Sequence, residues 1–367
     1  MVQVETVRTL DALEPLREEW NLLADRAESP LLSHEWFASC ARAFSADGDL
    51  RVVTIRRSHQ LVGIAPLTLR RFYGAPRLEL LGMAALNEPS GFLAADEESL
   101  AWLVDAVVQF RMPLLLQRMT EDSPVPALLG QKLPWSSVLM KRPSAGYLFV
   151  PVTASWAEYY KTLSSRITGN LRRVKTRSKA LGGTSIVVLT PAESDVKALL
   201  DEIVRVEGSG WKGRRGSALA RNPPLRTFFE HYSLRAAREG ILRVALLRFG
   251  DAVAAAELAV VAYRRWWQLK IGYAEEFAKH YPGLQLTEGT LRYAFDHALD
   301  SFEFLGSSAS WENNWRPETR RQRMAAVYPS SVSGLHAFSV DACLMVGRRV
   351  AEFTSRPSTP ARQPLRP

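Results

Sequence analysis

Hydrophobic and polar positions alternate along the chain in a way that predicts helices and strands in a defined order. In residues 192–207, apolar side chains recur every three or four positions with acidic residues between them, which is typical of an amphipathic helix. A glycine-rich loop and a second helix ending near Gly240 follow. The apolar positions of the first helix are Val196, Leu199, Leu200, Ile203 and Val206.

Strand-like segments come next in this part of the chain. Strands are predicted near residues 241–249, 252–262 and 264–272, and the dipeptide Gly250-Asp251 between the first two is typical of a tight hairpin. A helix near 284–299 and a short strand starting at Ser301 complete the pattern. We therefore expect helix, loop, helix, three antiparallel strands, helix and strand.

The N-terminal part predicts the same order. Helices are expected near 10–27 and 33–45, strands near 50–57, 60–70 and 76–82, a helix near 98–110 and an apolar strand near 112–117. Residues 51–69 also align without gaps on residues 243–261, an offset of 192 positions. Arg51, Val52 and Arg56 recur as Arg243, Val244 and Arg248, so we predict an internal repeat.

The repeat suggests a division of the chain. We expect a first half at residues 1–120, a proline-rich connector at 121–150, a second half at 151–330 and a C-terminal extension at 331–353. Residues 354–367, rich in Pro, Ser and Arg, cannot bury a core and are expected to be a disordered tail.

Composition narrows the class of protein. The 367 residues are 47% hydrophobic, enough for two cores, and the formal charge of +9 favours an anionic partner without naming one. Two cysteines and six scattered histidines predict neither a disulfide framework nor a structural metal. With no signal-like start and charges inside the most apolar region, 241–263, we expect a cytoplasmic protein without an integral membrane segment.

Gly208, Gly210 and Gly213 have the spacing of a dinucleotide-binding loop. That fingerprint must follow a strand and open a helix, because the pyrophosphate binds at the helix N-terminus. Here the glycines follow a helix and a double proline comes soon after, so the context fails. The loop is either a substrate-side loop or a structural turn. In the first case Trp211 supplies a flat face and Lys212 a charge, between glycines such as Gly213 that allow close backbone approach.

The order of elements, together with "VEGSGWKGRRGSAL", "YPGLQLTEGTLRYAF" and "FEFLGSSASWENNW", resembles the GNAT-related acyltransferase domain of the CelD/BcsL type. That family is associated with bacterial cellulose and exopolysaccharide gene sets and is related to the FemAB peptidyltransferases, which carry two GNAT-like halves. The resemblance implies an α/β fold of two GNAT-like halves, each with a mixed, mostly antiparallel sheet and flanking helices.

The resemblance also implies acyl transfer from acetyl-CoA or another acyl-CoA as co-substrate, with no tightly bound cofactor. In GNAT enzymes, main-chain N–H groups of an R/Q-x-x-G-x-G/A loop hold the CoA pyrophosphate. The corresponding segment here is "KHYPGLQL", which supplies Lys279, His280, Pro282, Gly283 and Leu284 as donor-binding candidates. It departs from the family pattern at its first position and after Gly283, where Leu284 and Gln285 replace a second small residue.

Acyl transfer needs a base for the nucleophile's proton and an acid for the leaving thiolate. Glu257, on an otherwise apolar strand, is either a base or the partner of an arginine. Glu207 is either a base or a solvated helix end. Tyr273 could protonate the thiolate or cover the core edge, and Lys270 on the same strand is a substrate-binding candidate.

Two further motifs are open to two interpretations. The basic run of residues 166–183 is either a solvated helix or a contact for tRNA, another anionic polymer or the CoA 3′-phosphate. Trp311 and Trp315 either stack on a sugar or pack in the core.

We therefore expect an acyltransferase that acts on an amine or hydroxyl of a small-molecule or saccharide acceptor. The alternatives are a FemAB-like transferase that uses aminoacyl-tRNA and a non-catalytic module that binds an anionic polymer or a biosynthetic partner. The oligomeric state is left open.

Overall fold

The computed structural model describes residues 1–46, 48–208, 219–306 and 311–354. The N-terminal half contains β1 (Val2–Val7), α1 (Leu10–Leu13), α2 (Arg17–Arg26), α3 (His34–Phe44), β2 (Leu50–Arg57), β3 (Gln60–Phe72), β4 (Ala75–Leu80), α4 (Met83–Leu86), β5 (Leu93–Ala94), α5 (Glu97–Val108) and β6 (Leu114–Thr120). The next segment contains α6 (Val125–Lys132) and β7 (Val138–Pro151).

The C-terminal half repeats this order and adds two helices before it and a helix after it. It contains α7 (Trp156–Thr162), α8 (Ser165–Ser178), β8 (Thr184–Leu189), α9 (Val196–Gly208), α11 (Pro223–Arg238), β9 (Leu242–Phe249), β10 (Ala252–Ala262), β11 (Arg265–Tyr273), the 3₁₀ segment η6 (Glu275–His280), α12 (Pro282–Asp296), β12 (Ser301–Glu303), η7 (Glu312–Trp315), β13 (Glu318–Tyr328) and α13 (Val332–Thr354). The helices and strands predicted from the periodicity are confirmed, with boundaries that differ by a few residues. No helix in the described ranges has the length and apolar content needed to cross a bilayer.

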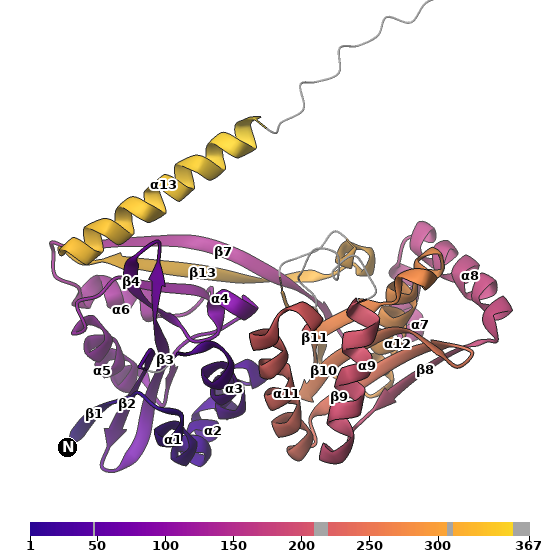
Figure 1. Cartoon of the computed structure of the whole chain (residues 1–367), viewed down its shortest axis with the longest axis horizontal. Coiled ribbons are helices and arrows are strands. Elements are labelled where there is room, and N and C mark those ends of the chain that lie inside the picture. Colours follow the sequence, from indigo (N-terminus) through magenta and orange to yellow (C-terminus); the bar gives the residue numbers. More distant parts are fainter. Residues whose placement is uncertain (47, 209–218, 307–310, 355–367) are drawn as a thin grey trace, which may run out of the picture.

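The strands form a continuous mixed sheet with helices packed against it (Figure 1). Its order is β1-β2-β3-β4-β6-β13-β7-β12-β11-β10-β9-β8, with β5 paired to β3. The pairs β4–β6 and β11–β12 are parallel, and the other pairs are antiparallel. The predicted α/β class is confirmed.

The two halves are related by the predicted offset of 192 residues, which the side chains also follow. Arg51 donates hydrogen bonds to the carbonyls of Gly48 and Leu50, and Arg243 donates to those of Gly240 and Leu242. The bulge in the β2–β3 pairing recurs at the corresponding position of β9–β10. The weak sequence repeat is therefore a structural repeat.

Equivalent residues also meet at the junction of the halves. The rings of Trp36 and Phe228, 192 positions apart, pack edge to face at 4.9 Å, and Ser39 Oγ lies 3.0 Å from His231 Nδ1, again 192 apart. Contact between a residue and its own equivalent is the signature of a two-fold relation. Helices α3 and α11 thus pack about a pseudo-two-fold axis, and the largest apolar cluster contains side chains of both halves.

The last strand of each half crosses to the other half. Strand β7 follows the N-terminal half in sequence but pairs with β12, whereas β13 follows the C-terminal half and pairs with β6. The two exchanged strands also pair with each other along the centre of the sheet. Residues 121–150, interpreted from their prolines as a connector, thus contain α6 and most of β7. The proposed domain boundaries stay a prediction.

Candidate functional site

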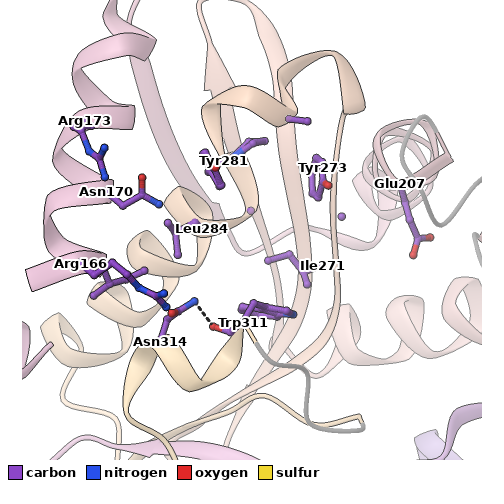
Figure 2. Close-up of a pocket in the computed structure, with 15 residues that line it drawn as sticks. Arg166, Asn170, Arg173, Glu207, Ile271, Tyr273, Tyr281, Leu284, Trp311 and Asn314 are labelled. Carbon is purple, nitrogen blue, oxygen red and sulfur yellow. Dashed lines mark hydrogen bonds between the residues drawn. The ribbon is translucent and has the colours of Figure 1, made fainter. Parts of the chain in front are cut away.

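A pocket of about 720 Å³ opens in the C-terminal half, between α8, the end of β11 and the start of α12 (Figure 2). Its lining is mostly apolar. Its polar side chains come from four separate segments, so that only the tertiary fold assembles them. The lining residues are Arg166, Ile167, Asn170, Arg173, Glu207, Ile271, Gly272, Tyr273, Ala278, Tyr281, Pro282, Gly283, Leu284, Trp311 and Asn314.

The N-terminus of α12 borders the pocket without a side-chain cap. Tyr281 precedes the helix in a left-handed conformation (φ 47°) and makes no capping hydrogen bond, and Pro282 at the first helical position has no N–H. The first N–H groups of a helix have no partner within the helix and carry its partial positive charge. The N–H groups of Gly283 and Leu284 are therefore placed to bind an anion.

The equivalent helix of the N-terminal half is closed to anions. The Asp96 carboxylate caps α5 by accepting the Ser99 N–H at 2.8 Å, and it pairs with Arg57 at 2.7 Å. Hydrogen bonds from Ser99 and then from Arg57 lower the pKa of Asp96 to about 2. Glu97 and Glu98 add further negative charge to the first turn. Of the two related helix starts, the one in the C-terminal half is suited to a phosphate.

Two arginines extend this positive character across the pocket. Arg166 and Arg173 lie with Asn170 on one face of α8, at spacings of four and three residues, and Figure 2 shows all three on the pocket side. Within the described residues, no carboxylate forms an ion pair with either arginine. Uncompensated guanidinium groups beside an uncapped helix end favour a polyanionic ligand.

The pairing of β11 with β12 ends before β11 reaches the pocket. Its parallel pairing with β12 ends at Trp267 and Glu303, although β11 continues to Tyr273. The β10–β11 register is irregular at Leu258 and Ala259, close to the point where β11 and β12 stop pairing. Among the described residues no strand pairs with this side of β11 beyond Trp267.

Glu207 and Lys270 form an ion pair at one end of the pocket. Glu207 ends α9 with 2% of its surface exposed, and its Oε1 lies 2.8 Å from Lys270 Nζ. Its Oε2 accepts the Leu219 N–H at 3.1 Å. A Cβ added to Gly272 would lie 3.0 Å from Glu207 Cβ, so the glycine allows the end of α9 to pack closely on β11. The solvated helix end considered from the sequence is not what the structure shows.

Tyr273, Pro282, Gly283 and Leu284 also line this pocket, as Figure 2 illustrates for Tyr273 and Leu284. Lys279 and His280 do not line it. Lys279 is exposed, and its carbonyl accepts a hydrogen bond from Arg177 at 3.2 Å. His280 is buried against Phe249, and burial lowers its pKa. Trp211, Lys212 and Gly213 lie outside the described residues.

Glu257 lies apart from the pocket, fully buried between β10 and α12. It accepts hydrogen bonds from Trp266 Nε1 at 2.7 Å and from Thr290 Oγ1 at 3.2 Å, so its partners are neutral donors rather than an arginine. Burial raises the pKa of Glu257 to about 7. This geometry fits a residue of the folded core.

The raised pKa of Glu257 makes stability depend on pH. The folded state holds the proton up to about pH 7 and the unfolded chain only to about pH 4.5, so this contribution is complete below pH 4.5 and disappears as the pH rises through 7. Glu257→Gln is expected to remove this dependence and to exceed the wild type above pH 7 by up to about 3 kcal/mol in unfolding free energy. Urea denaturation at several pH values measures it. Parallel curves for the two proteins would contradict the assignment.

The basic run forms α8, whose charges have different environments. Ile167, Leu171 and Val174 bury one face. Lys175 pairs with Glu288 at 2.6 Å, and Arg177 holds the loop before α12. The two tryptophans also differ, because Trp315 is fully buried whereas Trp311 lines the pocket.

The sequence did not single out Asn170, Ile271, Tyr281 or Asn314 for the site. The shared helical face of Arg166 and Arg173 was a usable signal, because positions seven residues apart lie on one side of a helix. For Asn170, Ile271, Tyr281 and Asn314 the sequence offered no such signal.

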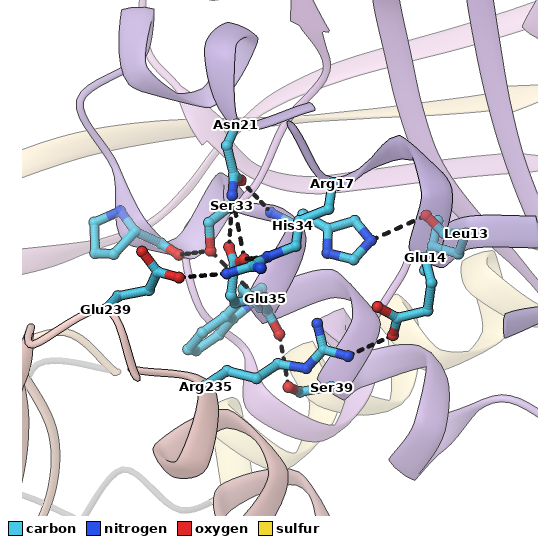
Figure 3. A network of polar contacts seen from close by, with 12 residues as sticks. Leu13, Glu14, Arg17, Asn21, Ser33, His34, Glu35, Ser39, Arg235 and Glu239 are labelled. Atoms are coloured by element: carbon cyan, nitrogen blue, oxygen red, sulfur yellow. Dashed lines mark hydrogen bonds and ion pairs between the residues drawn. The ribbon is translucent and has the colours of Figure 1, made fainter. Parts of the chain in front are cut away.

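A second cluster of titratable groups lies at the junction of the halves (Figure 3). Glu35 is buried and accepts hydrogen bonds from Arg17 at 2.6 Å and from Asn21 at 3.0 Å. Arg17 also pairs with Glu239, and Arg235 pairs with Glu14, both across the junction. These pairs join α1–α3 to α11, so the cluster serves to hold the halves together.

Comparison with known proteins supports the fold. Residues 165–313 match the family model described as Acetyltransferase (GNAT) domain. No curated protein matches the chain.

Several solved structures share the fold over most of the chain. FemX is 12% identical, with a TM-score of 0.57, over 88% of this chain and 96% of that one. The C-terminal domain of a protein described as a lysylphosphatidylglycerol synthetase, from Agrobacterium fabrum, is 14% identical, with a TM-score of 0.56, over 90% and 96%. A conserved protein of unknown function from Bacteroides thetaiotaomicron VPI-5482 is 9% identical, with a TM-score of 0.52, over 89% and 99%. At these identities the likeness concerns the fold alone.

Proposed function

We propose that this protein is an acyltransferase that moves an acyl group from acyl-CoA to an amine or hydroxyl. The observation that carries the proposal is the uncapped N-terminus of α12, which opens into the same pocket as Arg166 and Arg173, two arginines that form no ion pair with a described carboxylate. The GNAT match over residues 165–313 includes all of these elements and agrees with it.

Each part of CoA has a suitable partner in the pocket. The pyrophosphate would accept hydrogen bonds from the N–H groups of Gly283 and Leu284. Arg166 and Arg173 would neutralise its charge. The pantetheine arm would lie along the mostly apolar lining that the end of β11 gives the pocket. The thioester would then lie toward Glu207.

The ion pair at the end of the pocket supplies the base. The Glu207 carboxylate accepts the proton of the attacking amine or hydroxyl while the new C–N or C–O bond forms at the thioester carbon. Lys270 Nζ lies 2.8 Å from Glu207 Oε1 and holds the carboxylate in place. The C–S bond breaks, and the leaving thiolate takes a proton from the Tyr273 hydroxyl, which is restored from solvent. Glu257 is buried away from these groups, so we assign it no part in proton transfer.

Fewer features of the pocket indicate the acceptor than indicate the acyl donor. Trp311 presents a half-buried ring to the pocket, and such a ring can stack on a sugar face. This supports a saccharide acceptor of the kind that the CelD/BcsL resemblance implies. The roles considered for Trp211, Lys212 and Gly213 stay a prediction.

Thermal unfolding with and without CoA, acetyl-CoA and longer acyl-CoAs tests the proposal. A ligand that binds only the folded state raises the midpoint, by about 2.7 kcal/mol in stability at 100 times its Kd. We expect a rise with CoA and none with adenosine, which lacks the pyrophosphate. No rise with any CoA compound would overturn the proposal.

A second candidate is transfer from aminoacyl-tRNA. Arg172 and Arg173 on α8, and Lys179 directly after it, are exposed, and a nucleic acid backbone could bind there. This alternative predicts tRNA binding that weakens steeply with salt, together with no effect of CoA on unfolding.

A further inference from the structure

A smaller pocket of about 410 Å³ adjoins the main one, and we call it the side pocket. The two pockets share Arg166 and Asn314 and therefore meet at these side chains. Figure 2 shows both residues on the side of the main pocket away from Glu207. All the residues that line the side pocket have polar side chains: Thr162, Ser164, Arg166, Asn313, Asn314 and Arg316.

Two guanidinium groups give the side pocket a positive charge. Arg316 Nη1 donates a hydrogen bond to the Thr162 carbonyl at 2.9 Å, which holds this side chain between η7 and the end of α7. Neither Arg166 nor Arg316 forms an ion pair with a carboxylate of the described residues, and no such carboxylate lines the side pocket. A guanidinium has five N–H donors, so Arg316 keeps donors for an anion.

The side pocket also lies at the start of α8. Ser164 is the N-cap of this helix, and the first turn contains Arg166 and no acidic residue. A helix N-terminus carries a partial positive charge, so a cation in the first turn is unfavourable unless an anion lies nearby. A negatively charged ligand group in the side pocket would therefore be stabilised by the helix end and by both guanidinium groups.

We propose that the side pocket binds the 3′-phosphate of CoA and thereby selects CoA over its dephosphorylated form. The inference rests on the proposed function, in which the pyrophosphate binds at the start of α12 and the thioester lies toward Glu207. The adenosine end then extends away from Glu207, where Arg166 and Asn314 border the side pocket.

The chemistry of the side pocket fits a phosphate monoester. Such a group carries about two negative charges and three strong acceptor oxygens. The two guanidinium groups, the amides of Asn313 and Asn314, and the hydroxyls of Thr162 and Ser164 supply donors for them. A phosphate on the acceptor is less favoured, because the reacting group of the acceptor has to reach Glu207 on the far side of the main pocket.

Isothermal titration of the full chain with CoA and with dephospho-CoA, which lacks only the 3′-phosphate, tests this inference. We expect CoA to bind about tenfold more tightly, because hydrogen bonds to a charged group are stronger than neutral ones. The difference should decrease at high salt, since the side pocket is open to solvent. Arg316→Gln is expected to weaken the binding of CoA and to leave that of dephospho-CoA nearly unchanged.

Ser164→Asp tests the same site with a change that preserves the helix. Aspartate is as good an N-cap as serine, and its charge is favourable at a helix start, so the unfolding temperature should not fall. Its carboxylate repels the 3′-phosphate, so we expect about a tenfold loss of CoA affinity and a much smaller loss for dephospho-CoA. The matched control is Ser155→Asp, the same change at the N-cap of α7, which lines neither pocket.

The outcomes separate this inference from the proposed function. Equal affinity of the wild type for CoA and dephospho-CoA would overturn the inference and leave the proposed function intact. Losses in Arg316→Gln and Ser164→Asp that are the same for both compounds would do so as well. Binding of neither compound to the wild type would overturn the proposed function and this inference with it.

Discussion

Glu207→Gln is expected to lower kcat by about 10²- to 10⁴-fold, the usual contribution of a positioned general base, with CoA affinity nearly unchanged. The amide keeps the size of the carboxylate but cannot take the nucleophile's proton. Steady-state kinetics with an acceptor found by screening amines and sugars would measure the loss. CoA titration of the same variant would show whether the donor still binds.

The ion pair with Lys270 requires a second variant. Removing one partner of a buried pair leaves the other charge without compensation and destabilises the fold. We therefore expect the double variant Glu207→Gln, Lys270→Met to recover the unfolding midpoint without recovering kcat. Glu202→Gln, on the same helix but paired at the surface with Arg205, is the control and should keep full activity. Wild-type kcat in Glu207→Gln would remove the residue from the mechanism.

Gly283→Asp is expected to weaken CoA binding by about 10²- to 10³-fold, because like charges brought together in a binding site cost several kcal/mol. The same carboxylate stabilises the helix, since negative charge in the first turn of α12 is favourable. Ligand affinity and protein stability should thus change in opposite directions. Isothermal titration with CoA and thermal unfolding without ligand measure the two effects.

Gly283→Ala is the matched control at this position. An added Cβ would lie 3.7 Å from Tyr273 Cδ1, an ordinary contact, and alanine in a helix is more stable than glycine by about 0.5–1 kcal/mol. The variant keeps the N–H and adds no charge, so it should bind CoA far better than Gly283→Asp. Equal affinity of the two variants would contradict an anion site at this helix end.

Local physics explains why most of the fold could be predicted. The apolar face of α9 follows from the spacing of residues within one helix. The turn at Gly250 and Asp251 follows from the backbone preferences of these two residues. The repeat was visible because Arg51 and Arg243 make the same local contacts in both halves.

The site was only partly predictable. The helix start at Gly283 could be predicted, because its resemblance to the GNAT pyrophosphate loop depends only on residues next to one another in the sequence. The pair Glu207–Lys270 joins positions 63 residues apart, and neither side chain indicates its partner in the sequence. Glu257 shows the converse, since an isolated carboxylate on an apolar strand suggested chemistry until its buried, neutral partners were known.

The sequence by itself determined the type and order of the elements, their turns and the two-fold repetition, because these depend on residues close in the chain. Only the tertiary structure decided the exchange of β7 and β13, the approach of α8 to the uncapped start of α12, and the closure of the equivalent helix by Asp96. The physical reason is that the alternation of apolar and polar residues along a strand specifies which of its faces is buried but not which strand lies beside it. The neighbouring strand is determined by packing between elements far apart in the sequence.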